Sequence, residues 1–361
     1  MHLMSRSSSI MAVEYSLGGQ RRTYEELEER FGAEVMKKVF AGSGIRNRQV
    51  AEASICGSDL AVTAAEKLLN RYAVPRDSID LLIYCTQTPD HFMPATACLI
   101  QDRLGLGKRC GAFDINLGCS QYVYGLSVAH SMIVAGVANR ALLLTGDTMS
   151  RTVNPKDRAL VPLMGDAGSA TLIDPVQAEA GFLGFELGTD GSGARHNLIP
   201  AGGFRQPISP ETAVEITDAE GNTRTPQNMY MNGVAIYAFA ISTVPKAIAN
   251  LLAKLNLTLD QLDCVLFHQA NRYMLDYLVR KLKLPVEKTH FFIEDTGNTS
   301  GSTMPAVLTE AIRHGKVKAG SLVLMIVFGN GLSWAATVVR WVEGTSADQP
   351  RLASTQSTID E

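Results

Sequence analysis

The stretch VPRDSIDLLIYC, residues 74–85, recurs as LTLDQLDCVLFH, residues 257–268, at an offset of 183 residues. Each copy has an aspartate after a predicted helix, a second aspartate three residues later, and then an apolar strand that ends in an aromatic and a polar residue. The same offset relates the turn Gly118-Cys119-Ser120 to the turn Gly301-Ser302-Thr303, and an apolar helical stretch follows each turn. The repeat therefore predicts two similar halves.

Each half alternates strands with helices, which predicts an α/β fold with parallel sheets covered by helices on both faces. We expect the first half to span residues 1–185 and the second to span residues 186–361. The connection at about 188–228 is rich in Gly, Pro, Asn and Thr, and we expect it to form loops over the functional site. The polar tail after residue 342 is predicted to be disordered.

The composition favours a compact soluble protein, since 46% of the 361 residues are hydrophobic and 19% are charged. A formal net charge of −3 argues against a nucleic-acid-binding surface, which needs an excess of Lys and Arg. The six cysteines form no CxxC pair, so neither a zinc site nor a disulfide framework is expected. The first residues lack the apolar core of a signal peptide, and no unbroken apolar run is long enough to span a membrane. We therefore predict a cytoplasmic location without membrane insertion.

Cys119 lies at a predicted strand-to-helix turn, between the strand at 111–115 and the apolar segment 122–137. A helix N-terminus carries roughly half a positive charge and has free backbone N–H groups. A cysteine there gains thiolate character, and its own N–H can face a developing oxyanion. Cys119 is therefore a candidate nucleophile. The alternative is a small buried hydrophobic residue, which is the usual role of a free cysteine.

Three polar segments follow predicted strands in the second half. His268 ends one strand, although a lone histidine in such a place is more often structural than catalytic. The small polar residues 295–302 follow a predicted strand at 291–293, and the glycine-flanked turn 328–331 follows another buried strand. Each of these alone is also explained as a helix cap or an ordinary turn. Because ligands gather at the carboxyl ends of parallel strands, we expect the two halves to bring His268 and Cys119 face to face.

Together these segments resemble the β-ketoacyl-acyl-carrier-protein (ACP) synthase III family of the thiolase superfamily. The resemblance spans roughly residues 10–342. The segments that carry it are 43–46, 118–120, 154–158, 165–168, 268–271, 297–300 and 328–331. It implies a homodimer with a thiolase-like fold, in which two pseudo-symmetric α/β halves form a five-layered αβαβα core.

The resemblance also implies the role of each site residue. Cys119 would take the acyl primer as a thioester, with the backbone N–H groups of Cys119 and Asn330 forming the oxyanion hole. His268 and Asn298 would donate hydrogen bonds to the thioester carbonyl of malonyl-ACP, because loss of CO₂ leaves an enolate that neutral donors stabilise. The enolate would then attack the acyl group on Cys119 and give β-ketoacyl-ACP. Only the thioester substrates, acyl-CoA or acyl-ACP and malonyl-ACP, would be needed, without a metal or redox cofactor.

The residue types also separate this pattern from those of related families. A biosynthetic thiolase would carry a second cysteine in 328–331, and type I or II synthases would have a histidine where Asn298 stands. A hydroxymethylglutaryl-type synthase would need a glutamate in the loop after Tyr84, where this chain reads Cys-Thr-Gln-Thr. Plant-type polyketide synthases share the Cys-His-Asn set, but their surrounding motifs are less similar to those of this chain.

Two positions depart from the family. Its housekeeping members stack the adenine of coenzyme A between an arginine, matched by Arg158, and a tryptophan, whose place falls at about Lys38. Loss of one stacking face weakens adenine recognition, so a CoA primer and a carrier-bound primer both stay open. The second departure is Asn330, which replaces the middle glycine of a three-glycine loop.

By position against the family, the acyl pocket would contain Met93, Met164, Met231 and Tyr237, with Met93 reaching the partner subunit's pocket. A methionine in an apolar run is more often simply core. On the segment after His268, Asn271 is a candidate contact for the phosphopantetheine arm. The cations of that segment would receive the acidic surface of ACP, and their alternative is a solvated face. The docking candidates are Arg272, Arg280 and Lys281.

Two other functions stay open. An acyltransferase would load Cys119 but pass the acyl group to an alcohol or amine, and release of CO₂ from malonyl-ACP separates it from a condensing enzyme. A length-setting subunit of a heterodimeric synthase would usually lack the nucleophile, whereas Cys119, His268 and Asn298 are all present.

Overall fold

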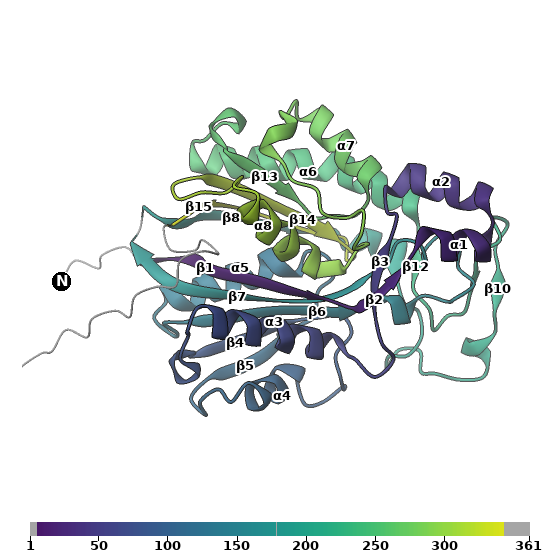
Figure 1. Ribbon diagram of the computed structural model, residues 1–361, viewed down its shortest axis with the longest axis horizontal. Helices are drawn as coiled ribbons and strands as arrows, with labels where there is room; N and C mark the ends of the chain where they lie inside the picture. The colour runs from purple at the N-terminus through teal and green to yellow at the C-terminus, as the bar shows by residue number, and fades with distance from the viewer. Residues whose placement is uncertain (1–5, 178, 343–361) are drawn as a thin grey trace, which may run out of the picture.

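The computed structural model describes residues 6–177 and 179–342, so the tail predicted to be disordered lies outside the described residues. Two β-sheets lie one above the other, with strand orders β1-β7-β6-β4-β5 and β13-β14-β15-β8 (Figure 1). The first sheet consists of β1 (Arg6–Leu17), β4 (Leu81–Cys85), β5 (Gly111–Ile115), β6 (Ala141–Thr148) and β7 (Asp166–Gln177). The second consists of β8 (Gly181–Thr189), β13 (Cys264–Phe267), β14 (Leu322–Gly329) and β15 (Ser333–Arg340).

Helices fill the space between the sheets and cover both outer faces. Helices α5 (Gln121–Val134) and α8 (Thr303–Arg313) lie between the sheets and share one apolar core with the inner faces of both. Helices α3 (Gly57–Arg71) and α4 (Thr96–Arg103) cover the first sheet from outside. Helices α6 (Gly233–Leu255) and α7 (Arg272–Lys281) cover the second. The result is the five-layered αβαβα core that the resemblance implied (Figure 1).

The two copies of the repeat occupy corresponding places. β4 pairs in parallel with β6, as β13 pairs with β14, and the turns at 118–120 and 301–303 lead into α5 and α8. The boundary expected between residues 185 and 186 falls inside β8, which pairs with β15 of the second sheet. The division of the chain into two domains stays a prediction.

The sheets differ from the sequence expectation in two ways. They are mixed, because β7 and β15 run antiparallel to both of their neighbours. The connection from β14 to β15 is only residues 330–332, which is too short for the crossover that a parallel pair requires. The strand predicted at 291–293 is absent, because the Phe292 N–H donates to the Gln269 side chain (3.0 Å) instead of to a neighbouring strand.

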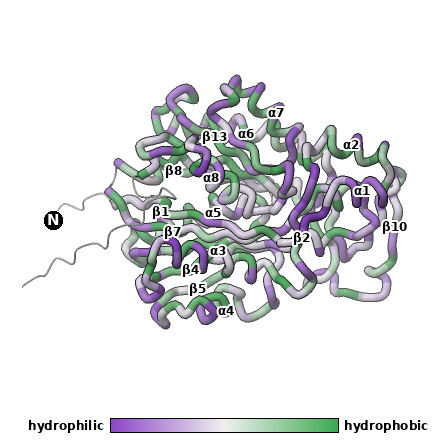
Figure 2. Tube along the Cα trace, in the orientation of Figure 1, coloured by the Kyte–Doolittle hydropathy of each residue, from purple (hydrophilic) through white to green (hydrophobic). Residues whose placement is uncertain are grey.

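A third region covers one end of the two sheets, on the right in Figure 1. It combines the N-terminal elements with the short strands between residues 197 and 231, and its apolar centre includes Met36, Met149 and Met229. Its segment from β2 to α1 is hydrophilic (Figure 2). The elements are β2 (Gly19–Arg22), α1 (Tyr24–Phe31), α2 (Ala33–Ser43), β3 (Arg48–Ala51), β9 (Asn197–Leu198), β10 (Ile216–Thr217), β11 (Thr223–Arg224) and β12 (Tyr230–Met231).

Helix α6 is the one helix in the described residues that is long and apolar enough to cross a membrane, by length and composition alone. It contains Pro245, and one of its sides, including Val244, Ile248 and Leu251, packs against the second sheet. A core helix passes the same test, so this is weak evidence for a membrane span. The cytoplasmic location stays a prediction.

Candidate active site

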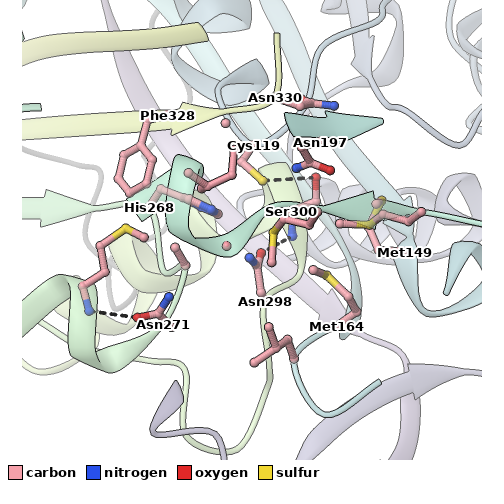
Figure 3. Close-up of a pocket in the computed structure, with 18 of the residues that line it drawn as sticks. Cys119, Met149, Met164, Asn197, His268, Asn271, Asn298, Ser300, Phe328 and Asn330 are labelled. Carbon is pink, nitrogen blue, oxygen red and sulfur yellow. Dashed lines mark hydrogen bonds between the residues drawn. The ribbon is translucent and has the colours of Figure 1, made fainter. Parts of the chain in front are cut away.

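Cys119 lies between β5 and α5 and lines a cavity of about 740 Å³ (Figure 3). Two glycines let the neighbouring loops approach it. A Cβ on Gly329 would stand 2.9 Å from the Cys119 Cβ, and a Cβ on Gly118 would overlap the Asn330 side chain. Because real Cβ atoms do not approach so closely, these positions require glycine, and the turn of the first half packs directly on the loop of the second.

His268 follows β13 and lines the same cavity. Its Nδ1 lies 2.6 Å from the Thr303 Oγ1, and its ring meets the Phe328 ring edge to face at 5.4 Å. The Thr303 hydroxyl also lies 3.0 Å from the Ser300 carbonyl oxygen. The imidazole is therefore held at one nitrogen and along one face, which leaves Nε2 without a hydrogen-bond partner among the described residues.

Asn298 is held through its backbone and through its side-chain oxygen. Its N–H donates to the Leu163 carbonyl (2.8 Å), and its Oδ1 accepts from the Ser300 N–H (3.0 Å) (Figure 3). Because Oδ1 serves as the acceptor, the Nδ2 hydrogens are left to donate into the cavity that Asn298 lines. The amide is thus oriented as a donor before any substrate arrives.

The protonation states differ from the expectation that Cys119 has thiolate character. Burial raises the pKa of Cys119 to about 12, and the Ser300 hydroxyl, 3.9 Å from Sγ, offsets only part of this effect. Desolvation is therefore a larger effect on this thiol than the hydrogen bonds that lower its pKa. Burial also lowers the pKa of His268 to about 3, so its imidazole is neutral at pH 7. The pair is a protonated thiol beside a neutral imidazole, and the thiol needs a proton acceptor before it attacks.

A chain of amides beside Cys119 was not singled out by the sequence analysis. The Asn330 Nδ2 donates to the Gln87 Oε1 (2.6 Å), and the Gln87 Nε2 donates to the Ser300 Oγ (2.9 Å). The buried Asp147 carboxylate accepts from the Gln87 N–H (2.7 Å) and fixes the loop after β4. The sequence held one signal: Gln87 follows β4 as Cys119 follows β5, and these strands are parallel neighbours.

Seven of the fourteen predicted site residues line this cavity. Met164, Met231 and Asn271 line it, and the Asn271 Oδ1 caps α7 by accepting from the Met274 N–H (2.8 Å). The cavity also includes residues that the sequence analysis did not propose, namely Gln87, Met149, Leu163, Asn197, Met229, Gly233, Ile236, Ala270, Met274, Ser300, Phe328 and Gly329. Among the described residues, no group of His, Cys, Asp or Glu is placed to hold a metal ion.

Four predicted substrate-binding residues do not line the cavity. Tyr237 packs against the rings of Tyr273 and Tyr277, and the side chain of Met93 is 79% exposed. Arg158 donates to the Glu220 carbonyl, and Lys38 is exposed on α2. The adenine clamp therefore stays a prediction, with Arg158 held by the loop that contains Glu220.

The predicted docking cations lie at the surface of α7 with different partners. Arg272 pairs with Asp276 (2.8 Å) and stacks on the Phe291 ring at 4.0 Å. The Lys281 Nζ donates to a carbonyl of α6 (2.8 Å). Arg280 is exposed and makes no ion pair with any residue the structure describes. Of these three cations in the described structure, Arg280 therefore has the fewest side-chain contacts with other residues.

Comparison with known proteins assigns the family. Residues 113–191 match 3-oxoacyl-acyl-carrier-protein synthase III, and residues 252–341 match the C-terminal part of the same family. The β-ketoacyl-acyl-carrier-protein synthase III of Caldanaerobacter subterraneus subsp. tengcongensis is 35% identical over 299 residues, which cover 83% of this chain and 87% of that protein.

Solved structures agree with this result. A 2.1 Å crystal structure of a 3-oxoacyl-acyl-carrier-protein synthase III is 40% identical, with a TM-score of 0.91, over 93% of this chain and 100% of that one. The priming β-ketosynthase of the R1128 polyketide pathway is 26% identical, with a TM-score of 0.82, over 95% of this chain and 98% of that one. This chain therefore belongs to the 3-oxoacyl-acyl-carrier-protein synthase III family and has its thiolase fold.

Proposed function

We propose that Cys119 takes an acyl primer as a thioester, and that the acyl-enzyme then condenses with malonyl-ACP to give β-ketoacyl-ACP and CO₂. One observation carries the proposal: Cys119 from the first half shares a single cavity with His268 and Asn298 from the second. Family membership makes the chain a condensing enzyme, and the roles of these three residues are what we propose for it.

In the loading step, the Cys119 thiol loses its proton as Sγ attacks the primer's thioester carbon. Neutral His268 is the base, because its Nδ1–H can donate to the Thr303 hydroxyl while that hydroxyl donates to the Ser300 carbonyl. Nε2 then carries the lone pair that accepts the thiol proton. The bond from the acyl carbon to the carrier sulfur breaks, and the carrier leaves as a thiol with that proton. The backbone N–H groups of Cys119 and Asn330 stabilise the oxyanion.

In the condensing step, His268 and Asn298 act as neutral donors. Proton exchange with solvent first moves the single imidazole proton of His268 from Nδ1 to Nε2, and Thr303 then donates to Nδ1 instead of to the Ser300 carbonyl. The Nε2–H and the Asn298 Nδ2 hydrogens bond the thioester oxygen of malonyl-ACP, so that breaking the carbon–carboxylate bond releases CO₂ and leaves a stabilised enolate. The enolate carbon attacks the acyl carbonyl, the bond from the acyl carbon to Sγ breaks, and the Cys119 thiolate takes up a proton from solvent.

The proposal includes the delivery of both thioesters and the assembly of the enzyme. Asn271 lines the cavity, and its Nδ2 makes no hydrogen bond with any residue the structure describes, so it is available for the phosphopantetheine arm. The exposed cations of α7 suit the acidic surface of ACP. The exposed apolar side chains of Phe92 (81%) and Phe204 (95%), whose rings meet at 6.0 Å, support a homodimer, because exposed apolar patches mark interaction sites.

The test combines mass and gas release. Wild type and Cys119→Ala are incubated with acyl-CoA and acyl-ACP donors, and intact-protein mass reports acylation. Malonyl-ACP is then added and CO₂ is measured. We expect a mass gain on wild type alone, followed by CO₂ and β-ketoacyl-ACP. A loaded enzyme that releases no CO₂ but acylates an alcohol or amine would favour the acyltransferase. No loading with any donor would contradict the proposal and point to a subunit of a heterodimer.

A further inference from the structure

A second cavity continues the first one beyond Gln87 and Asn330. It has about 510 Å³ of open volume, and half of its ten lining residues also line the cavity that contains Cys119. We call it the amide pocket, because four of its lining residues carry carboxamides and two are threonines. It is lined by Gln87, Thr88, Asn116, Met149, Thr152, Asn197, Leu198, Ile199, Met229 and Asn330.

The amide pocket lies on the side of Cys119 that the extender substrate does not need. His268, Asn298 and the N-terminal ends of α6 and α7 line the Cys119 cavity, and none of them lines the amide pocket. In the proposed function, the malonyl thioester occupies the side of His268 and Asn298. The acyl chain on Cys119 must leave that side free, so it extends past Gln87 into the amide pocket.

Two of the four carboxamides there are free to bind a ligand through both ends of the amide, and a third, Asn330, has a buried Oδ1 without a partner among the described residues. Gln87 is satisfied at both ends of its amide, by Asn330 and by Ser300. The side chains of Asn116 and Asn197, by contrast, make no hydrogen bond with any residue the structure describes. Asn197 is half-buried, and its backbone is fixed by the pairing of β9 with β12. A half-buried amide without a partner is unfavourable next to an alkyl chain and favourable next to a group that donates or accepts.

The absence of charged residues from the lining of the amide pocket disfavours an acyl chain that carries a carboxylate. No Lys, Arg, His, Asp or Glu is among the ten lining residues. A carboxylate on the acyl chain would therefore be partly desolvated without a cation to pair with it. A neutral hydroxyl or carbonyl oxygen meets no such cost, and a carboxamide can donate to either and accept from a hydroxyl.

We infer that the amide pocket selects an acyl primer with a neutral hydrogen-bonding group, a hydroxyl or a keto oxygen, over a plain alkyl primer or one that ends in a carboxylate. The inference rests on the proposed function, because it assumes that the acyl group sits on Cys119. Asn197 and Asn116 are the specificity-determining residues, and they act by pairing with the polar group of the primer.

The experiment compares four-carbon primers as pantetheine thioesters, which removes any preference for CoA or ACP. Butyryl, 3-hydroxybutyryl, acetoacetyl and succinyl thioesters compete in pairs for Cys119, and intact mass gives the ratio of loading rates. We expect the hydroxy or the keto primer to load about fivefold faster than butyryl, because one neutral hydrogen bond contributes about 1 kcal/mol. Asn197→Leu with Asn116→Leu should bring that ratio to about one or below.

A matched control is Asn250→Leu, the same change on an exposed part of α6, which should leave every ratio as in wild type. Equal loading of butyryl and both polar primers, or fastest loading of succinyl, would overturn the inference while leaving the proposed function intact. Unchanged ratios in the double variant would also overturn it. Failure of all four thioesters, together with all CoA and ACP donors, would instead contradict the proposed function.

Discussion

The repeated turns at 118–120 and 301–303 place Cys119 and Ser302 at corresponding positions, yet the two side chains differ in their surroundings. Cys119 lines the active-site cavity. Ser302 is fully buried, with its hydroxyl 2.7 Å from the Thr145 Oγ1 and 3.2 Å from the Ala167 carbonyl oxygen. One copy of the turn therefore presents the proposed nucleophile, and the other connects α8 to the first sheet.

The repeated strands also differ, but here the copy in the second half lines the cavity and the copy in the first half is buried in the core. His268 corresponds to Cys85, which is fully buried beside Gly125, and burial raises the pKa of the Cys85 thiol. At both of these duplicated positions, 119/302 and 85/268, only one of the two residues lines the cavity. In the proposed function, the nucleophile comes from the first half and the donors from the second, so neither half alone contains a complete site.

The largest expected effect separates His268 from Cys85. His268→Ala should lower the rate of condensation by about a thousandfold, because it removes a proton acceptor and an enolate donor. Cys85→Ala should keep that rate and lower the free energy of unfolding by about 1–2 kcal/mol, as expected for a small core truncation. Steady-state kinetics and denaturant unfolding on both variants check this, and equal kinetic losses would remove the contrast.

A similar pair tests Cys119 against Ser302, now by stability. Ser302→Ala should lower the free energy of unfolding by about 1 kcal/mol, because buried hydrogen bonds to Thr145 and Ala167 are lost, while Cys119 still loads. Cys119→Ala should change stability by less than about 0.5 kcal/mol. Denaturant midpoints measure both values. A Cys119 variant that unfolds as readily as the Ser302 variant would show that the thiol also holds the fold together.

Substitution of Thr303 tests the proposed roles of His268, because the Thr303 hydroxyl is the partner of the His268 Nδ1 in both the loading step and the condensing step. Thr303→Val should lower kcat about tenfold with little change in KM, since one neutral hydrogen bond to the imidazole is lost. Thr303→Ser should restore the rate. A structural role alone would lower stability without this split between kcat and KM, and restored stability without restored kcat would contradict the assignment.

The pH profile gives an independent check on His268. Its pKa is lowered to about 3, so the imidazole stays neutral at all higher pH values and gains its proton only as pH falls through that range. Protonation of His268 should therefore cause no fall in kcat between pH 8 and about 5. An acid limb with a midpoint near 6.5 in wild type, absent from His268→Ala, would contradict the burial argument.

The smallest expected effect compares the surface charges of corresponding helices. α7 carries three cations and one carboxylate, whereas α4 carries one of each. Arg280→Glu with Lys281→Glu should raise the KM for malonyl-ACP about three- to tenfold at low salt and less at high salt, without changing kcat. The matched control reverses Lys108 and Arg109, which are exposed before β5, at the end of that strand away from Cys119. Equal effects of both double variants would indicate a non-specific effect of net charge.

Apolar strands and glycine-flanked turns are local patterns, so the sequence alone predicted the repeated strand and turn segments. The family resemblance added the five layers and the seven predicted residues that line the cavity, which are Cys119, Met164, Met231, His268, Asn271, Asn298 and Asn330. The sequence did not predict that β7 and β15 run antiparallel to their neighbours. The direction of β15 follows from the short connection at 330–332, which cannot make the crossover that a parallel strand needs. The sequence assigned thiolate character to Cys119 from the helix N-terminus alone, whereas burial, which depends on the tertiary fold, raises the pKa of this thiol. The Gln87 and Asn330 bridge joins residues 243 positions apart, and Gln87 had no motif to mark it.

The most direct test of the central claim measures the two half-reactions separately on Cys119→Ala and Asn298→Ala. Intact mass reports acyl loading, and labelled CO₂ from malonyl-ACP reports decarboxylation. Cys119→Ala should lose loading but retain decarboxylation, whereas Asn298→Ala should load normally and release CO₂ at least about a hundredfold more slowly. Loss of both half-reactions in both variants, with the fold intact, would contradict a division of labour between the two halves.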